Sequence, residues 1–404
     1  MDLEILSQLV HEDVPSQHAF SEEEYASRLA RLRAAMAAAH VDVVLLSSPE
    51  SQCWLHGYQA RWYRTGSPTT WPPSNFTAAH VDHDRVIVFD SADHAPLIRF
   101  TSVAEDIRHP AVDDPNLDDI SSSLITELGA EGWLGGVLGI EKWSPRQNAA
   151  TTEHLESRLA GHVTRVTDVS VLMRDLQRIK SPAEVATIRE ASQILDAAYT
   201  HLLAGNLSPT MTEAEVWAEL QWAMARAGGE TGGLHDTVSR TRNYCHAFSS
   251  TRPIGQGQLL ADPCGVKHRY HANTARQFYL GDPPDALVEA AAVAGGAADV
   301  LIEVAKPGVS FAAVSTQLRE YYQSHGLWQL RDWIGGYQLG IAFPPDWVGE
   351  FHWSVELDEQ EKFVEHGLVT NFESFVGGGL IDTVIFLDGG AEVLSSIPRR
   401  LLVV

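Results

Sequence analysis

Hydrophobic residues recur with helical spacing early in the chain and then give way to short, continuous apolar runs. Ser21 and Glu24 form a capping pattern that predicts the start of a helix. The apolar face of this helix recurs at Tyr25, Leu32 and Met36. Continuous apolar runs of four to eight residues are typical of buried strands. Such strands are predicted at residues 41–48, 84–89 and 135–143, with a further helix around 121–128.

The pattern changes after residue 180, where two more capping patterns occur. Ser181 is followed by Glu184, and Thr212 by Glu215, so a helix is predicted to begin at each place. Alternating apolar residues then predict a hairpin-like pair of strands. The later elements are this pair at 258–264 and 269–281, helices at 285–305 and 311–325, and strands at 368–375 and 383–390.

The length of the chain and this change of pattern together predict two domains. Single hydrophobic cores rarely keep growing beyond about 250–300 residues, and this chain has 404. Strand-rich sequence gives way to capped helices near residues 174–180. We therefore expect an α/β domain over residues 1–175 and a second domain, of mixed helices and strands, over 176–404.

The charge balance narrows the classes of partner. The 53 acidic and 29 basic residues give a formal net charge of -24. Phosphate backbones and anionic membranes attract the opposite sign, so we expect no nucleic acid and no membrane among the partners. The charge is compatible with a small cationic or zwitterionic substrate, although a solvated acidic surface explains the same number.

The termini and cysteines favour a cytoplasmic protein. The first residues contain neither a basic region nor a long apolar run, so no signal peptide is predicted. No stretch approaches the roughly 18 apolar residues of a membrane span. Cys53, Cys245 and Cys264 are far apart in the sequence, which is typical of a reducing compartment without zinc-finger chemistry.

Five segments, in this order, resemble the creatinase/aminopeptidase P superfamily. The resemblance extends over essentially the whole chain. It implies an α+β protein with a C-terminal pita-bread domain, preceded by a smaller α/β creatinase-type N-terminal domain. The segments are RIKSPAEVATIREASQILDAAY from 178, NLSPTMTEAEVW from 206, RYHANTARQFYLGDPP from 269, NFES from 371 and GGAEVL from 389.

The resemblance also implies where metal ligands would lie. Peptidases of this superfamily hold two metal ions with two aspartates, one histidine and two glutamates, and only two of these five positions keep a carboxylate here. Catalytic metals usually take three or more protein ligands. We therefore predict no metal and no cofactor. The five positions correspond to Asp262, Asn273, Tyr337, Glu373 and Ile381.

The turn around Tyr337 resembles that of the metal-free ectoine hydrolases. Tyr337 lies among glycines ahead of a Pro-Pro-Asp-Trp sequence at 344–347, and the RYHA sequence begins at Arg269. The chain departs from this pattern at Asp262, where ectoine hydrolases carry glutamate, and at Ala275, where creatinase does. The resemblance implies a metal-independent hydrolase of a C–N bond in a small amidine or amide.

Three residues are candidates for the acid-base chemistry of such a reaction. His246 matches the histidine that creatinase uses for proton transfer, and imidazole exchanges protons near neutral pH. Asp262 and Glu373 are expected to be brought together by the fold, so that one pKa rises and that group can act as an acid. The alternatives are a structural histidine and a relic carboxylate pair. A nucleophilic Cys264 is less favoured than a buried, inert thiol.

Other residues are candidates for substrate binding. Tyr270 and Tyr337 could donate hydrogen bonds to a substrate, unless they are core tyrosines with satisfied hydroxyl groups. Asp346 and Trp347 are expected at the mouth of the pocket, where an aromatic face suits a delocalised cation. A rigid turn packed by tryptophan is the equal alternative.

The sequence GYQARWYR, at 57–64, adds a second group of binding candidates. In members of this superfamily, dimerisation brings the corresponding region close to the partner's active site. Arg61, Trp62 and Arg64 are therefore candidates to bind a substrate carboxylate, the arginines in a bidentate manner. An interface patch of a homodimer, where arginine and aromatic residues are also enriched, explains the same residues.

Three other functions remain compatible with the sequence. A lyase or a biosynthetic enzyme could use the same pocket for proton abstraction on another small molecule. A non-catalytic descendant could bind a small molecule or a partner without turnover. A residual metallopeptidase would require about two divalent ions per chain.

Overall fold

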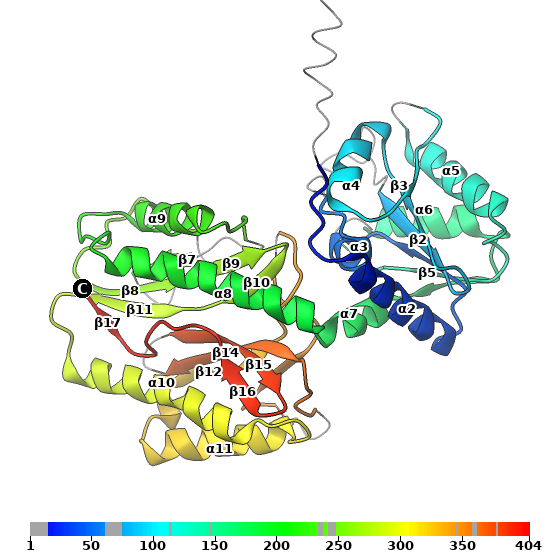
Figure 1. The fold of residues 1–404 in the computed structure, drawn as a ribbon. Coiled ribbons are helices and arrows are strands. Elements are labelled where there is room, and N and C mark those ends of the chain that lie inside the picture. The colour runs from blue at the N-terminus through cyan, green and yellow to red at the C-terminus, as the bar shows by residue number, and fades with distance from the viewer. Residues whose placement is uncertain are drawn as a thin grey trace, which may run out of the picture. The chain divides into compact units, whose positions relative to one another are not determined.

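The computed structural model describes residues 15–60, 75–112, 115–144, 148–232, 237–240, 248–344, 346–357, 362–376 and 379–404. The chain divides into two compact units, Met1–Leu176 and Gln177–Val404, each with its own sheets and helices (Figure 1). Among the described helices, none is long and apolar enough to cross a membrane.

A six-stranded mixed sheet forms the centre of the first unit. Its strand order is β4-β3-β2-β1-β5-β6, with β1 parallel to β5 and antiparallel to β2. All three predicted strands of this region are present, as β1, β3 and β5. The strands are β1 (Val43–Leu46), β2 (Phe76–His80), β3 (Val86–Phe89), β4 (Asp106–Arg108), β5 (Val137–Ile140) and β6 (Arg165–Asp168).

The helices of the first unit pack apolar residues against this sheet. The first described helix begins as predicted, because the hydroxyl group of Ser21 accepts a hydrogen bond from the backbone N–H of Glu24 (3.4 Å). Val43, Leu124 and Leu155 belong to one buried core. The helices are α2 (Glu22–Ala38), α3 (Pro49–His56), a short 3-10 turn η1 (Ala92–His94), α4 (Ala95–Thr101), α5 (Leu117–Ala130) and α6 (Ala149–Leu159), while α7 (Ser170–Arg178) includes the boundary between the units.

A buried glutamate joins strand ends in this unit. Glu141 follows β5, and its carboxylate accepts hydrogen bonds from the backbone N–H groups of Ser47 (2.8 Å) and Ser48 (2.7 Å). The hydroxyl group of Ser51 donates a third hydrogen bond (2.5 Å). Burial raises the pKa of Glu141, while the three donors favour its charged form. Glu141 therefore holds the start of α3 against the end of β5.

The second unit begins with two capped helices that cover a four-stranded sheet. The predicted capping boxes at Ser181 and Thr212 are both formed. Leu259, Ala261 and Phe278 pack beneath these helices in one core. The elements are α8 (Pro182–Leu203), α9 (Glu213–Arg226), β7 (Thr237–Ser239), β8 (Gly257–Asp262), β11 (Arg276–Leu280) and β17 (Leu402–Val403), with sheet order β17-β11-β8-β7.

The predicted hairpin-like pair is present but is interrupted. Strand β8 pairs with β11, and the chain between them forms a separate antiparallel pair of β9 (Cys264–Lys267) and β10 (Tyr270–Asn273). Pro263 lies at the break between β8 and β9, where its missing N–H cannot continue a ladder of hydrogen bonds. Asp262 and Asn273 therefore lie at strand ends, beside the interruption.

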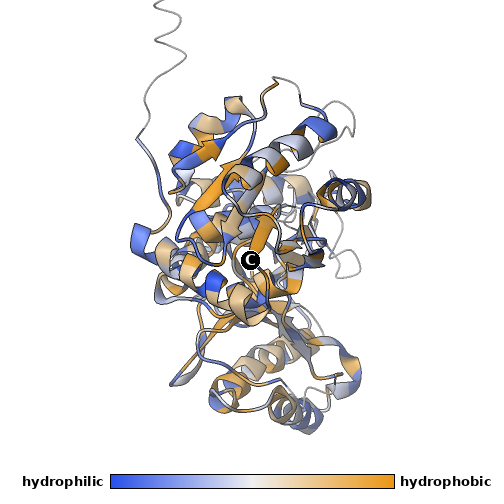
Figure 2. Cartoon of the chain, turned by 90° about the vertical axis from the view of Figure 1, so that its right-hand side faces the viewer, coloured by the Kyte–Doolittle hydropathy of each residue, from blue (hydrophilic) through white to orange (hydrophobic). Residues whose placement is uncertain are grey.

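A five-stranded antiparallel sheet completes the second unit. The two predicted helices of this region cover it in Figure 1, which shows α8 and α9 on the opposite side of the unit. Figure 2 shows strongly hydrophobic strands and helices with both hydrophobic and hydrophilic faces. The elements are α10 (Asp285–Val304), α11 (Phe311–Ser324), a 3-10 turn η3 (Trp328–Leu330), β12 (Arg331–Tyr337), β13 (His352–Ser354), β14 (Val369–Val376), β15 (Leu380–Leu387) and β16 (Gly390–Val393), with sheet order β13-β12-β14-β15-β16.

Candidate active site

Two carboxylates from different sheets of the second unit come close to each other. Asp262 is the last residue of β8, and Glu373 lies within β14. Their proximity is evident electrostatically, because the negative charge of Asp262 raises the pKa of Glu373. The fold thus joins two carboxylates that are 111 positions apart in the chain.

Glu373 has the proton affinity of an acid-base catalyst. Burial, together with the negative charge of Asp262, raises the pKa of Glu373 to about 7. Hydrogen bonds from Asn371 and Tyr337 act in the opposite direction, because they stabilise the charged carboxylate. At neutral pH, Glu373 is therefore present in both protonation states and can either donate or accept a proton.

Tyr337 connects Glu373 to the indole ring of Trp347 through hydrogen bonds. The hydroxyl group of Tyr337 forms a hydrogen bond with the Glu373 side chain and accepts one from Nε1 of Trp347 (3.0 Å). Burial, together with the charges of Glu373 and Asp262, holds the pKa of Tyr337 well above its usual value. Tyr337 is therefore a protonated phenol that donates to Glu373.

Asn371 is a supporting residue that sequence reasoning missed. It is fully buried, and its Nδ2 donates to Oε1 of Glu373 (2.8 Å). Its Oδ1 accepts from the backbone N–H of Tyr337 (2.8 Å). One side chain thus orients both the carboxylate and the phenol. The spacing of two residues between Asn371 and Glu373 on one strand was the available signal, since such residues share a face.

Asn273 orients the other carboxylate. Its Nδ2 donates to Oδ1 of Asp262 (2.8 Å) and to the carbonyl oxygen of Pro263 (3.3 Å). Its backbone is held by Thr383, whose hydroxyl group accepts from the N–H of Asn273 (2.8 Å) and donates to its carbonyl oxygen (2.9 Å). Oδ1 of Asn273 is buried and receives no hydrogen bond from the described residues.

Apolar side chains surround Ile381, the position that the resemblance predicts to correspond to a metal ligand. Ile381 pairs with Glu373 across β14 and β15, and it packs with Leu260, Ala275 and Phe375. The next residue, Asp382, is fully buried in an ion pair with Arg276 (2.6 Å). Asp382 is therefore occupied in the core by Arg276.

The donor set does not fit a paired metal centre. Within the described part of the chain, no group of three or more His, Cys, Asp or Glu side chains could hold a metal ion. Asn273 turns an N–H donor toward Asp262, and the Tyr337 oxygen is engaged by Trp347 and Glu373. Ile381 has no donor atom. Divalent cations require several converging anionic or imidazole ligands, so no reaction step is assigned to a metal here.

Two predicted binding residues have other contacts. The hydroxyl group of Tyr270 donates to Oε1 of Glu184 at the start of α8 (2.8 Å), and strand alternation places Tyr270 and Asn273 on opposite faces of β10. The exposed carboxylate of Asp346 accepts from the backbone N–H groups of Trp347 (2.8 Å) and Val348 (3.2 Å). Asp346 thus shapes the turn that presents Trp347, while Tyr270 anchors β10 to α8.

The remaining candidates fall partly outside the described residues. His246 lies within 241–247, and Arg61, Trp62 and Arg64 lie within 61–74, so none of these four is among the residues described. Cys264 is buried and pairs with Asn273 across β9 and β10.

Comparisons with known proteins agree with this architecture. Residues 28–179 match the Creatinase/Prolidase N-terminal domain, and residues 186–379 match Metallopeptidase family M24. An ectoine hydrolase of Halomonas elongata is 26% identical over 419 residues, covering 95% of this chain and 98% of the relative. A creatinase of a Bacillus species is 23% identical over 399 residues, covering 94% and 92%.

The solved structure of an X-Pro aminopeptidase from Thermotoga maritima has a similar fold. It superposes with a TM-score of 0.75 at 17% identity, covering 94% of this chain and 99% of that structure. The chain therefore belongs to the creatinase/aminopeptidase P superfamily. In the sequence, a creatinase-type N-terminal domain is followed by an M24 domain of the pita-bread fold. The predicted family and fold class are confirmed.

Proposed function

We propose that this protein hydrolyses a C–N bond in a small amidine or amide without a metal ion. The observation that carries the proposal is Glu373, a carboxyl group with a pKa of about 7 beside a second carboxylate, Asp262. The similarity to an ectoine hydrolase and a creatinase supports this class of substrate. Both names denote enzymes of small molecules rather than of peptides.

In the proposed reaction, the oxygen of one water bonds to the electrophilic carbon while the C–N bond breaks. Protonated Glu373 gives its proton to the departing nitrogen. The proton lost by the water passes to Asp262 or to His246, so the reaction consumes one water and returns the site to one bound proton. Asn371 and Tyr337 hold Glu373 in place through both halves of the exchange.

The polar and aromatic groups of the site favour a cationic or zwitterionic substrate. Asp262 supplies negative charge, and Oδ1 of Asn273 is an acceptor that no described residue uses. The carboxylate of Asp262 and Oδ1 of Asn273 can both accept hydrogen bonds from the N–H groups of an amidinium. Trp347 is joined to Tyr337 at this site, and aromatic faces attract delocalised cations. In this proposal Asp346 lies at the mouth of the pocket, where its carboxylate shapes the turn that carries Trp347.

Proton NMR of the chelator-treated protein with ectoine, 5-hydroxyectoine, creatine and a proline dipeptide tests the proposal. We expect one of the first three compounds to be converted to an open-chain or cleaved product whose mass is that of the substrate plus one water. The Glu373→Gln variant should lose at least about 100-fold in rate, because it removes a general acid.

Glu303→Gln is the matched control, because Glu303 is an exposed carboxylate on α10 and should leave turnover unchanged. Turnover by Glu373→Gln at the rate of the unmodified protein would refute the role of Glu373. A product that gains no water would indicate a lyase, and ligand-induced thermal stabilisation without product would indicate a binding protein.

We propose in addition a cytoplasmic homodimer in which Arg61, Trp62 and Arg64 of one subunit approach the site of the other. The resemblance to creatinase-type enzymes supports this arrangement. Light scattering coupled to size-exclusion chromatography should give twice the chain mass of 44.3 kDa. A single-chain mass would refute the arrangement.

A further inference from the structure

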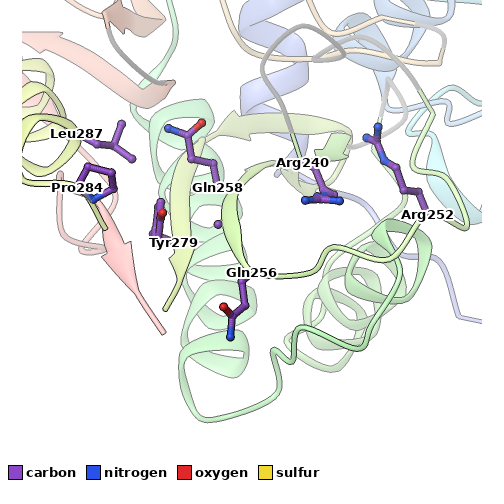
Figure 3. Close-up of a pocket in the computed structure, with 8 residues that line it drawn as sticks. Arg240, Arg252, Gln256, Gln258, Tyr279, Pro284 and Leu287 are labelled. Atoms are coloured by element: carbon purple, nitrogen blue, oxygen red, sulfur yellow. The ribbon is translucent and has the colours of Figure 1, made fainter. Parts of the chain in front are cut away.

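A pocket lies beside the start of β8, apart from the carboxylate pair. Its volume is about 630 Å³, within the range of about 300–1,000 Å³ typical of small-molecule sites. Figure 3 shows two arginines toward one side, three largely apolar residues toward the other and two glutamines between them. The lining residues are Arg240, Arg252, Gln256, Gly257, Gln258, Tyr279, Pro284 and Leu287.

The pocket is cationic in a strongly acidic protein. Its lining contains two arginines and no carboxylate, whereas the chain carries a net charge of -24. Arg252 is ion-paired with the buried Glu213, which leaves Arg240 to give the pocket about one net positive charge. Among the described residues, none forms an ion pair with Arg240. An arginine in a recess suits a carboxylate, because its planar fork can donate two parallel hydrogen bonds.

The side of the pocket opposite the arginines indicates which further chemical group the ligand carries. Tyr279 pairs with Gln258 across β8 and β11, and its ring lies near Pro284 and Leu287 in Figure 3. These three side chains provide an apolar surface with a phenol group. Gln256 and Gln258 provide neutral amide groups between this surface and the arginines. The combination matches a compact carboxylate that carries an apolar group.

The pocket is separate from the reacting carboxylates. Gln258, Leu260 and Asp262 alternate along one face of β8, so the pocket and Asp262 share a face of the sheet. Gln258 and Asp262 are four positions apart along the strand, a distance of about 13 Å. Leu260 lies between them and packs against Ile381.

We infer that this pocket is a binding site for a small apolar carboxylate, distinct from the site of hydrolysis. The inference does not depend on the proposed reaction, because it rests on the Arg240 pocket alone. Isothermal titration calorimetry with benzoate and with benzamide tests it, since the two probes have the same shape and differ in charge.

Benzoate should bind with saturation at one site per chain, and benzamide at least about 10-fold more weakly, because it lacks the charge-assisted hydrogen bonds. Arg240→Gln and Gln258→Glu should each weaken benzoate by at least about 10-fold. Gln258 is exposed, so the second variant tests the pocket without disturbing packing. Arg226→Gln, at an exposed arginine on α9, should bind benzoate as the unmodified protein does.

Three results would overturn the inference. Equal binding of benzamide and benzoate would show that charge is not recognised, and unchanged benzoate affinity in both pocket variants would place the ligand elsewhere. Loss of benzoate binding in Glu373→Gln would assign the carboxylate to the reacting site instead. Absence of turnover with full benzoate binding would count against the proposed reaction only.

Discussion

The elevated proton affinity of Glu373 makes a quantitative prediction about stability. The pKa of Glu373 rises from its ordinary value of 4.5 to about 7 on folding. The folded state therefore binds this proton more tightly than the unfolded state does, and stability falls as pH rises through this interval. At about 1.36 kcal/mol per pH unit, the full loss of unfolding free energy is about 3 kcal/mol.

Most of this loss falls within an accessible range of pH. Between pH 5.5 and 8.5, the same relation gives a decrease of about 2 kcal/mol that is specific to Glu373. Glu373→Gln removes the titrating group while keeping its size. The variant should therefore gain about 2 kcal/mol relative to the unmodified protein across this range, because titrating groups that do not interact with Glu373 contribute equally to both proteins.

Urea denaturation followed by circular dichroism at half-unit pH steps measures this difference. Glu303→Gln, at an exposed carboxylate on α10, provides the comparison for the removal of one carboxyl group. A difference between Glu373→Gln and the unmodified protein that stays constant from pH 5.5 to 8.5 would show that Glu373 has an ordinary pKa. The acid-base role assigned to it would then fail as well.

Three further changes test neighbouring contacts. Tyr337→Phe should raise the pKa of Glu373 above about 7, because it removes a hydrogen bond to the charged carboxylate. Carboxyl ¹³C NMR titration measures this pKa, and Glu373→Gln assigns the resonance. An unchanged or lower pKa would contradict the prediction. Arg276→Met should cost about 3–5 kcal/mol by leaving Asp382 buried and unpaired, and adding Asp382→Leu should recover most of the loss in urea denaturation. Dialysis against EDTA should leave turnover unchanged, because the described residues do not fit a metal centre; activity restored only by added divalent ions would refute this.

Local signals allowed many elements to be predicted from the sequence. The capping boxes at Ser181 and Thr212 and the buried strand β3 were expected because each depends on residues close together in the chain. The pairing of Asp262 with Glu373 depends instead on contacts between distant strands. It was predicted only through the resemblance to a known fold, which supplies the long-range arrangement that local patterns lack.

Other features of the site could not be anticipated so readily. Nothing in the sequence around Asn371 marks it as a site residue. Only its two-residue spacing from Glu373 on the same strand indicates that the two side chains share a face. The same alternation of side chains places Tyr270 and Asn273 on opposite faces of β10. The hydrogen-bond partner of Tyr270, Glu184, lies 86 positions away in the sequence. The pocket at Arg240 combines the residue that follows β7, the chain before β8, β8 itself, β11 and the start of α10, so no single segment of sequence carries its signal.

The apolar contact of Ile381 with Leu260 and Ala275 restricts which side chains position 381 can accept. A glutamate introduced at position 381 would be buried against these side chains beside Glu373, and a buried, unpaired carboxylate is strongly unfavourable. A glutamate at this position is therefore expected to give a less stable protein unless Leu260 or Ala275 is replaced as well. The packing around Ile381 thus disfavours a further carboxylate beside Glu373 as a single substitution.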